Sequence, residues 1–372
     1  MPVVLRTLMW LLMRWSGVLW LWRFLHRKHV TILMLHGVMD TEQTNVWTPL
    51  RSHLSRQALD GALRVLSRYY QFVSLSDAVD MITGRKPPQP NSLVLTFDDG
   101  YRNNLTHALP ILQRYHVPAT FFVVPAYIKQ QKPFWFDRLD YVLQHAEIDG
   151  RSLAVGDTTI HFRGRSRNRL RESYRDLREA AKAIPDDVAM QRELEALTLQ
   201  LEQESGMRLA DTSGEDDWAT ILTWDGVRAA MAKQVTIGSH TVDHVRLGLV
   251  SLDTARDQLL RSREMIEREV GVPCRYFCYP NGSFTEPIAN LVQECGYEAA
   301  VTTEEGVNRL GENLMMLRRL PFPDTGDSVK TLADVSGLSL TVARLRERVG
   351  VLKYWGKFAI QKISNSSSES RG

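Results

Sequence analysis

The sequence predicts an α/β protein whose parallel sheet closes, or nearly closes, into a barrel. Short apolar segments alternate with helical segments along most of the chain, and strands that are each followed by a helix pair in parallel. Polar residues stand where those apolar segments end, which is where such barrels carry their chemistry. These residues are His36, Asp98, Asp99, His240, His244 and Pro280. The coincidence predicts one site at one rim of the barrel.

In the first part of the chain, an apolar strand over 30–35 ends at His36-Gly37. A helix over 55–70 follows, because its leucines recur at helical spacing. The next expected elements are a strand over 71–75, a helix over 77–83 with Ser76 as its N-cap, a strand ending at Asp98-Asp99-Gly100, a helix over 103–115 and a strand over 119–124.

Residues 134–220 are rich in Arg, Glu and Leu. They predict a mostly helical insertion with a small strand pair near 152–163. Strand and helix then alternate again, and the expected elements are a helix over 225–233, a strand over 235–239, a helix over 253–270, a strand over 276–279, a helix over 285–295 and strands over 298–302 and 315–320.

Composition sets few limits on the function. The chain has 372 residues, of which 44% are hydrophobic, enough for one large domain with insertions or for two domains. The net charge is +3, and the basic residues are spread along the chain, so we expect no nucleic-acid partner. The three cysteines are an odd number without metal-finger spacing, which predicts no disulfide framework.

Residues 1–29 predict a helix at a membrane interface. Tryptophans and leucines are interrupted by arginines, a mixture that suits the bilayer interface. The longest uncharged runs, 7–13 and 15–22, fall short of the roughly 18–20 residues that span a bilayer. An uncleaved signal anchor and a helix packed on the domain remain open. We expect a protein associated with a bacterial inner membrane, on a side that the sequence leaves open.

The C-terminal residues 326–372 predict a basic amphipathic tail with a disordered end. This tail is a candidate second surface anchor, and an ordinary terminal helix is the alternative.

The adjacent carboxylates Asp98 and Asp99 indicate a nearby cation, because like charges at this spacing repel. His240 and His244 are four residues apart, so on a helical turn they would project from one face. Two imidazoles and one carboxylate are a common ligand set for Zn²⁺, and Co²⁺ or Ni²⁺ are also accepted. The alternative is a solvated acidic turn with incidental histidines.

The segments Thr96–Gly100 and Ser239–His244 resemble the first two motifs of the polysaccharide deacetylases, the NodB-homology enzymes of carbohydrate esterase family 4. The resemblance covers roughly residues 30–325 apart from the insertion. It is nearest to the branch with a Tyr-Pro-x-Gly third motif, here residues 279–282, as in poly-β-1,6-N-acetylglucosamine deacetylases.

The resemblance implies a distorted (β/α)₇ barrel with a helical insertion, and metal-dependent removal of N-acetyl groups from amino sugars. It implies that Asp98 is the general base and that Asp99, His240 and His244 bind the metal. A metal-bound carboxylate stays an anion, so its neighbour is free to accept a proton from water, which agrees with this division.

The third motif departs from the family pattern. Its usual arginine position is occupied by Cys278, and Arg275 lies three residues earlier. The backbone N–H of Asn281 could still serve the oxyanion, because that role needs no side chain. We name three substrate-binding candidates, Tyr279, Pro280 and Trp224, although Trp224-Asp225 is also typical of a helix start.

No histidine follows His244, so the family's late histidine acid is absent. His36 stands in a segment, Met34–Val38, that resembles the branch in which a histidine after the first strand is the general acid. Its position at a strand end suits a proton donor near neutral pH. A histidine that only hydrogen-bonds a loop remains the alternative.

The sequence thus predicts a metal-dependent hydrolase that removes N-acetyl or similar acyl groups from amino sugars of an exopolysaccharide or lipid-linked saccharide. A peptidoglycan or chitin-type deacetylase is one alternative, and a catalytically silent carbohydrate-binding barrel is another. The expected partners are an N-acetylated saccharide and a membrane surface. The saccharide, its linkage, the metal and the oligomeric state stay open.

Overall fold

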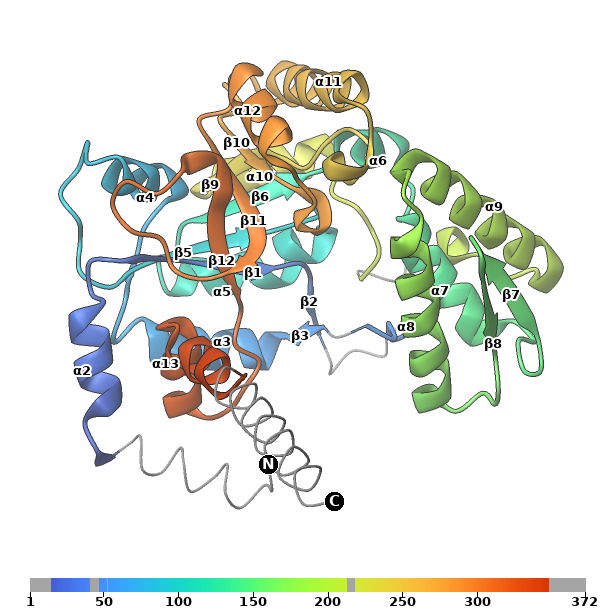
Figure 1. Ribbon diagram of the computed structural model, residues 1–372, viewed down its shortest axis with the longest axis horizontal. Helices are drawn as coiled ribbons and strands as arrows, with labels where there is room; N and C mark the ends of the chain where they lie inside the picture. The colour runs from blue at the N-terminus through green and yellow to red at the C-terminus, as the bar shows by residue number, and fades with distance from the viewer. Residues whose placement is uncertain (1–14, 41–46, 52, 213–217, 348–372) are drawn as a thin grey trace, which may run out of the picture.

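The computed structural model describes residues 15–40, 47–51, 53–212 and 218–347. Its centre is a closed barrel of seven parallel strands (Figure 1). The order around the barrel is β1-β12-β11-β10-β9-β6-β5, and β1 pairs with β5 to close it. The strands are β1 (Val30–Leu35), β5 (Ser92–Phe97), β6 (Ala119–Val123), β9 (Val235–Ser239), β10 (Tyr276–Cys278), β11 (Ala299–Glu305) and β12 (Leu317–Pro321). The predicted barrel is confirmed.

Short apolar runs, such as Leu93–Leu95 and Phe121–Val123, explain the central strands β5 and β6. All residues of β5 and β6 are buried, as expected when helices cover a parallel sheet outside and side chains fill its interior. The short strand β4 (Gln71–Phe72) pairs with the start of β5 outside the ring. Two further short strands, β2 (Val38–Met39) and β3 (Leu54–Ser55), pair with each other beyond the end of β1.

Helices surround the barrel, and polar caps fix where several of them begin. Ser55 caps α3 and Ser251 caps α11, each accepting a hydrogen bond from a backbone N–H in the first turn. The covering helices are α3 (Arg56–Leu66), α4 (Leu75–Ile82), α5 (Leu109–Arg114), α6 (Pro125–Gln130), α10 (Trp224–Met231), α11 (Leu252–Val270), α12 (Glu286–Glu294) and α13 (Ser328–Val335).

The predicted start of α4 needs a correction. The side chain of Ser74, not Ser76, accepts the capping hydrogen bond from the N–H of Asp77. Ser74 has the extended backbone of an N-cap residue, whereas Ser76 already lies inside the first turn.

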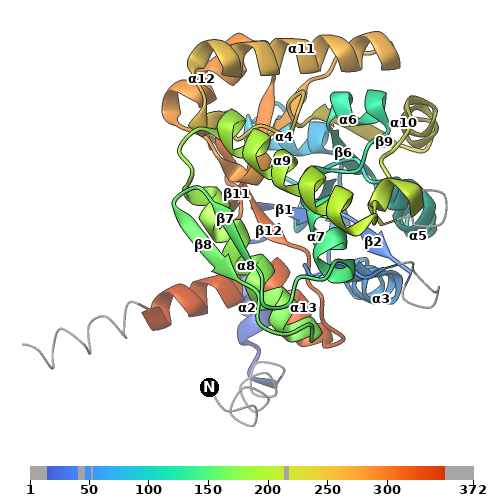
Figure 2. The same cartoon turned by 90° about the vertical axis from the view of Figure 1, so that its right-hand side faces the viewer.

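The insertion between β6 and β9 has its own apolar core. It contains α7 (Trp135–His145), the antiparallel pair β7 (Ser152–Val155) and β8 (Thr158–His161), and the long helices α8 (Arg167–Ala183) and α9 (Asp187–Ser205). In Figure 2, which looks at this region face-on, the hairpin and the long helices lie in front of the barrel. The fully buried Asp187 joins the insertion to the barrel by an ion pair with Arg246.

Both ends of the described chain pack on the barrel. In α2 (Val18–Leu25), Leu19 is buried and the indole N–H of Trp22 donates to the carbonyl of Ser336 at 2.9 Å. Val329 and Val335 of α13 belong to the barrel's core cluster. The barrel's core therefore includes residues that follow 325, the end of the barrel predicted from the sequence. The predicted disordered end lies outside the described residues.

No helix of the described ranges has both the length and the apolar character needed to cross a membrane.

Candidate active site

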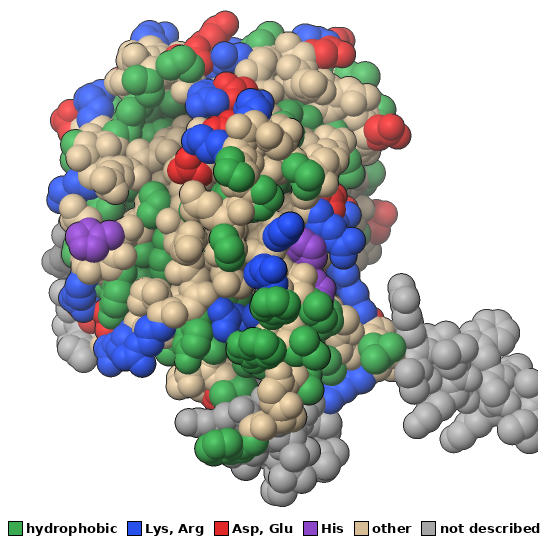
Figure 3. Space-filling view, turned by 90° about the vertical axis from the view of Figure 1, so that its left-hand side faces the viewer, with side chains coloured by type: hydrophobic (Ala, Val, Ile, Leu, Met, Phe, Trp, Pro, Cys, Tyr) green, Lys and Arg blue, Asp and Glu red, His purple; other side chains and the backbone are tan. Residues whose placement is uncertain are grey.

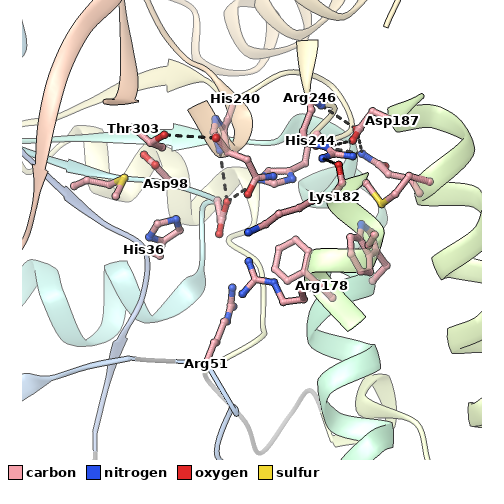
Figure 4. A pocket seen from close by; sticks show the side chains of 18 residues that line it. His36, Arg51, Asp98, Arg178, Lys182, Asp187, His240, His244, Arg246 and Thr303 are labelled. Carbon is pink, nitrogen blue, oxygen red and sulfur yellow. Dashed lines mark hydrogen bonds and ion pairs between the residues drawn. The ribbon is translucent and has the colours of Figure 1, made fainter. Parts of the chain in front are cut away.

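A cavity of about 290 Å³ opens at the C-terminal rim of the barrel, between the strand ends and the insertion (Figure 4). The lining includes six of the residues predicted from sequence: His36, Asp98, Asp99, His240, His244 and Asn281. Helices α7 to α9 of the insertion line the opposite side, and Arg51 precedes β3 there. The barrel thus brings strand ends far apart in sequence to one space.

Asp99, His240 and His244 are arranged as a set of metal ligands. The Nε2 atoms of His240 and His244 lie 3.6 and 3.4 Å from Oδ1 of Asp99. Ligand atoms held about 2.1 Å from one ion at tetrahedral angles are about 3.4 Å apart. Oδ1 of Asp99 is buried and has no hydrogen-bond partner among the residues that the structure describes, which is costly unless another group satisfies it. The residues therefore fit a small divalent cation.

The environment of these ligands keeps them in the required protonation states. Nδ1 of His240 donates to the carbonyl of Cys278 at 2.7 Å, which leaves Nε2 as the free lone pair. Burial and His244 lower the pKa of His240 to about 4. Burial alone would raise the pKa of Asp99, but the surrounding imidazoles outweigh it and hold that pKa well below its usual range.

The histidine pair does not lie on a helical turn. After β9 the chain forms a loop in which Thr241 and His244 have positive φ values of 63° and 60°. Left-handed residues of this kind break helical repetition. Asp99 and Asn281 also have positive φ, 75° and 53°, so strained backbone gathers around this cavity, as it often does at functional sites.

Asp98 is held by an arginine that the sequence analysis missed. Arg319 of β12 donates from Nη1 and Nη2 to the two carboxylate oxygens of Asp98, at 2.8 and 2.7 Å. The same guanidinium also contacts Thr96, Cys278 and the carbonyl of Thr302. Asp98 and Arg319 are 2% and 1% exposed, so both charges depend on this pairing.

The pair fixes the state of Asp98. Burial would raise its pKa, but the charge and hydrogen bonds of Arg319 outweigh burial and hold the pKa below its usual value. Asp98 is therefore an anion that can accept a proton. Burial raises the pKa of the neighbouring Cys278 thiol well above its usual range, so this cysteine is a poor nucleophile.

His36 and Asn281 both line the cavity. His36 is an exposed side chain that follows β1, and Figure 4 shows it on the same side of the cavity as Asp98. Gly282, after Asn281, has φ +66°, and a Cβ there would lie 1.9 Å from Oγ1 of Thr303. This glycine allows the turn that brings Asn281 to the cavity.

The structure does not bring the three substrate-binding candidates to this cavity. Tyr279 is fully buried and its hydroxyl donates to the carbonyl of Met315. Pro280 is buried beside it. Trp224 is the first residue of α10, capped by Thr223, and lines a different cavity.

The sequence analysis also missed Arg51 and, in the insertion, Arg178 and Lys182. Their spacing on α8 was visible, but it did not show which side of the helix meets the barrel. For Arg319, the strand over 315–320 was expected and the arginine within it was visible. The family pattern places the arginine that contacts the base in the third motif, and this pattern did not indicate a residue of β12.

The closed barrel carries at one rim an Asp-His-His group that could hold a metal ion, beside a carboxylate held by an arginine, an arrangement typical of hydrolytic enzymes. The family model described as polysaccharide deacetylase matches residues 85–300, more than half of the chain. The chain belongs to the polysaccharide deacetylase family.

Curated relatives are distant. The chain is 18% identical to the putative polysaccharide deacetylase YxkH of Bacillus subtilis (strain 168) over 251 residues, 68% of this chain and 58% of that protein. It is 39% identical over 59 residues to poly-beta-1,6-N-acetyl-D-glucosamine N-deacetylase of Escherichia coli (strain K12), 16% of this chain and 9% of that protein. The chain therefore spans less than two thirds of these relatives.

Solved structures share the fold. The Streptococcus pyogenes deacetylase PplD, in complex with acetate, aligns with a TM-score of 0.53 at 16% identity, covering 82% of this chain and 98% of that one. IcaB from Ammonifex degensii aligns with a TM-score of 0.50 at 17% identity, covering 83% and 97%.

Proposed function

We propose that this chain is a divalent-metal-dependent hydrolase that removes N-acetyl, or similar acyl, groups from the amino sugars of an exopolysaccharide or a lipid-linked saccharide. One observation carries the proposal. Asp99, with a buried oxygen that lacks a hydrogen-bond partner among the described residues, faces two imidazoles, while both oxygens of the neighbouring Asp98 accept hydrogen bonds from Arg319. One carboxylate is thus available for a metal and the other for a proton.

Each residue of the site has a separate role in the proposed amide hydrolysis. A divalent cation held by Asp99, His240 and His244 would supply Lewis acidity, which favours the attack of water on an amide carbonyl. Asp98 accepts the proton of the attacking water. His36 gives a proton to the leaving amine as the C–N bond breaks, so acetate and a free amino sugar result.

Two alternatives differ from this proposal in testable ways. A peptidoglycan or chitin-type deacetylase would use the same residues and differ only in the groove. A silent carbohydrate-binding barrel would need no ionised Asp98. The buried pair of Asp98 and Arg319 argues against silence, because burying two charges is costly and a binding module gains nothing from it.

An acetate-release screen over defined N-acetylated oligosaccharides, with Zn²⁺, Co²⁺ or Ni²⁺ added back after chelation, tests the function. We expect metal-dependent release from at least one saccharide by the wild type and none by Asp98→Asn. Zinc is the first choice for this ligand set. Binding of saccharide without release under every metal would favour the silent barrel.

The exposed apolar face of α2 supports a second proposal, contact with a membrane surface. Trp20, Phe24 and Leu25 are 47–66% exposed, and Arg27 and Lys28 follow them. Residues 1–39 contain no Asp or Glu. Figure 3, which views the molecule from this side, shows hydrophobic side chains beside Lys and Arg side chains. Such a surface suits anionic headgroups.

Sedimentation with vesicles containing anionic lipid tests this contact. The double variant Trp20→Ser/Phe24→Ser should stay in the supernatant, while Leu252→Ser, which removes an exposed leucine of α11, should sediment like the wild type. Equal sedimentation of all three proteins would refute a role for α2.

A further inference from the structure

We propose that Arg178 and Lys182, together with Arg51, form a subsite for a phosphate group carried by the acetylated saccharide. The inference rests on the proposed function and narrows its substrate class to phosphorylated amino sugars. Figure 4 shows the charged ends of all three side chains turned toward the space that His36 also faces. All three line the same cavity as the candidate metal ligands.

Helix α8 presents two of these cations to the cavity. Arg178 and Lys182 are four residues apart, so they lie on the same face of the helix. Ala181 on that face also lines the cavity. Like charges at this spacing repel one another and destabilise a helix. The stability of α8 therefore does not explain why both cations stand on its barrel-facing side.

Arg178 is the key member because its charge is uncompensated. It is half-buried, and no carboxylate in the described part of the chain lies within ion-pair distance of it. Its guanidinium lies 5.9 Å from the ring centre of Tyr174, which supports one side. The planar hydrogen-bond donors of a guanidinium match phosphate oxygens.

Two other cations that line the catalytic cavity, Arg246 and Lys182, already have acidic partners. Arg246 is neutralised by Asp187, and Lys182 is paired at 2.7 Å with Glu179, three residues earlier on α8. Because both members of the latter pair are half-exposed, solvent weakens it and the ammonium can turn to a ligand.

Arg51 is fixed in place at the base of the subsite. Its Nη2 donates to Asp137 and to the hydroxyl of Tyr101, and its guanidinium lies 5.1 to 5.4 Å from aromatic ring centres, those of Tyr101, Phe136 and Trp218. Its Nε is buried and has no hydrogen-bond partner within the described ranges. This guanidinium is therefore preorganised, with donors left over.

The cavities place the subsite along the path of an extended ligand. Two further cavities, of about 480 and 400 Å³, share Arg51 and Arg178 with the catalytic cavity as lining residues. Asp324 lines the second of them together with Arg51 and Arg178. A saccharide that leaves the catalytic cavity in either direction must pass the two arginines.

The chemistry favours phosphate. One bidentate arginine satisfies a planar carboxylate, whereas guanidinium and ammonium groups from two different segments suit the tetrahedral arrangement of oxygens in a phosphate anion. The phosphate could come from a soluble sugar phosphate, a monoester that is mostly a dianion, or from a lipid-linked sugar, whose phosphodiester is a monoanion. Both present anionic non-bridging phosphate oxygens to Arg178.

Steady-state acetate release tests the subsite with three substrates: methyl N-acetylglucosaminide, N-acetylglucosamine 1-phosphate and its short-chain prenyl phosphodiester. We expect KM to be about tenfold lower, or more, for at least one phosphorylated substrate, with kcat little changed. The phosphorylated substrate with the lower KM shows whether the phosphate belongs to a soluble sugar phosphate or to a lipid-linked sugar. The variant Arg178→Gln/Lys182→Gln should lose this preference and still hydrolyse the neutral glycoside.

The control is Arg169→Gln, which removes an exposed arginine of the same helix that pairs with Glu172. It should keep the preference. Circular dichroism and metal content should match among all proteins. A wild type without the preference, or a double variant that retains it, overturns the subsite while leaving the deacetylase proposal intact.

If no saccharide is hydrolysed, isothermal titration calorimetry can test the phosphate subsite independently of the proposed deacetylase function. N-acetylglucosamine 1-phosphate should bind the wild type about tenfold more tightly than the double variant. In that case the proposed function fails and the subsite stands. Equal binding to both proteins overturns the subsite.

Discussion

Replacement of Arg319 by methionine tests the central electrostatic feature of the site. Methionine has a similar length and no charge, so it fills the space but cannot donate to Asp98. Five donor contacts disappear, two of them to the carboxylate oxygens of Asp98. Asp98, which is 2% exposed, is then left as an unpaired buried anion.

The expected loss is large. Removing one partner of a buried ion pair costs about 3–5 kcal/mol, against a total stability of about 5–15 kcal/mol for a typical domain. The pKa of Asp98 should rise in the variant, because burial raises it and Arg319 no longer opposes burial. The acid limb of the pH–rate profile should move to higher pH for the same reason.

The sign of the pH dependence follows from these shifts. In the wild type the pKa of Asp98 in the folded state is depressed. The ion pair with Arg319 therefore contributes its full stabilisation of the folded state at pH values above the unfolded-state pKa of about 3.9. This contribution is lost as the pH falls through the folded-state pKa. In Arg319→Met the folded pKa lies above the unfolded one, so the variant loses stability as pH rises from about 4. The difference between the two proteins should therefore grow from pH 4.5 to pH 7.

Urea unfolding followed by tryptophan fluorescence measures this difference. A double-mutant cycle with Asp98→Asn completes the test, because the doubly uncharged variant should be more stable than the sum of the two single changes implies. A coupling below about 0.5 kcal/mol, or a stability difference that does not change with pH, would refute the assigned pairing.

Three further substitutions test the roles of single residues. Asp98→Asn should abolish acetate release while metal content by elemental analysis stays at the wild-type level, and a rate near wild type would exclude Asp98 as the base. His240→Ala should lose most of the bound metal, and unchanged metal content would rule out this ligand set. His36→Gln should lower kcat strongly with metal content intact, whereas an unchanged kcat would mean that another group protonates the leaving amine.

Much of the fold could be predicted because local sequence and topology agree. The strand ending at Asp98 contains the apolar run Leu93, Val94 and Leu95, and all of its residues are buried in β5. The long helix expected over 253–270 is α11, Leu252–Val270, with Ser251 as its cap. The contribution of α13 was not predicted: its Val335 belongs to the core of the barrel, and a contact between segments so far apart in the sequence leaves no local pattern.

The candidate metal ligands could be predicted because each is next to a strand end. Position along a strand is a local property, and a barrel brings all C-terminal strand ends to one rim. The backbone conformation between His240 and His244 could not be predicted in the same way. Thr241 and His244 adopt left-handed backbone, which residues of these types favour only when tertiary contacts impose it.

Arg319 could not be found from the third motif because a barrel interior can be reached from any of its strands. β12 pairs with β1, which pairs in turn with β5, the strand that ends at Asp98. An inward side chain of β12 therefore reaches the same space as one from β10. Cys278 of β10 occupies the motif position, and its Sγ lies 3.2 Å from Nη2 of Arg319. A small thiol at that position leaves room for the arginine of another strand, so the chemistry of the pair persists although its position in the sequence has changed.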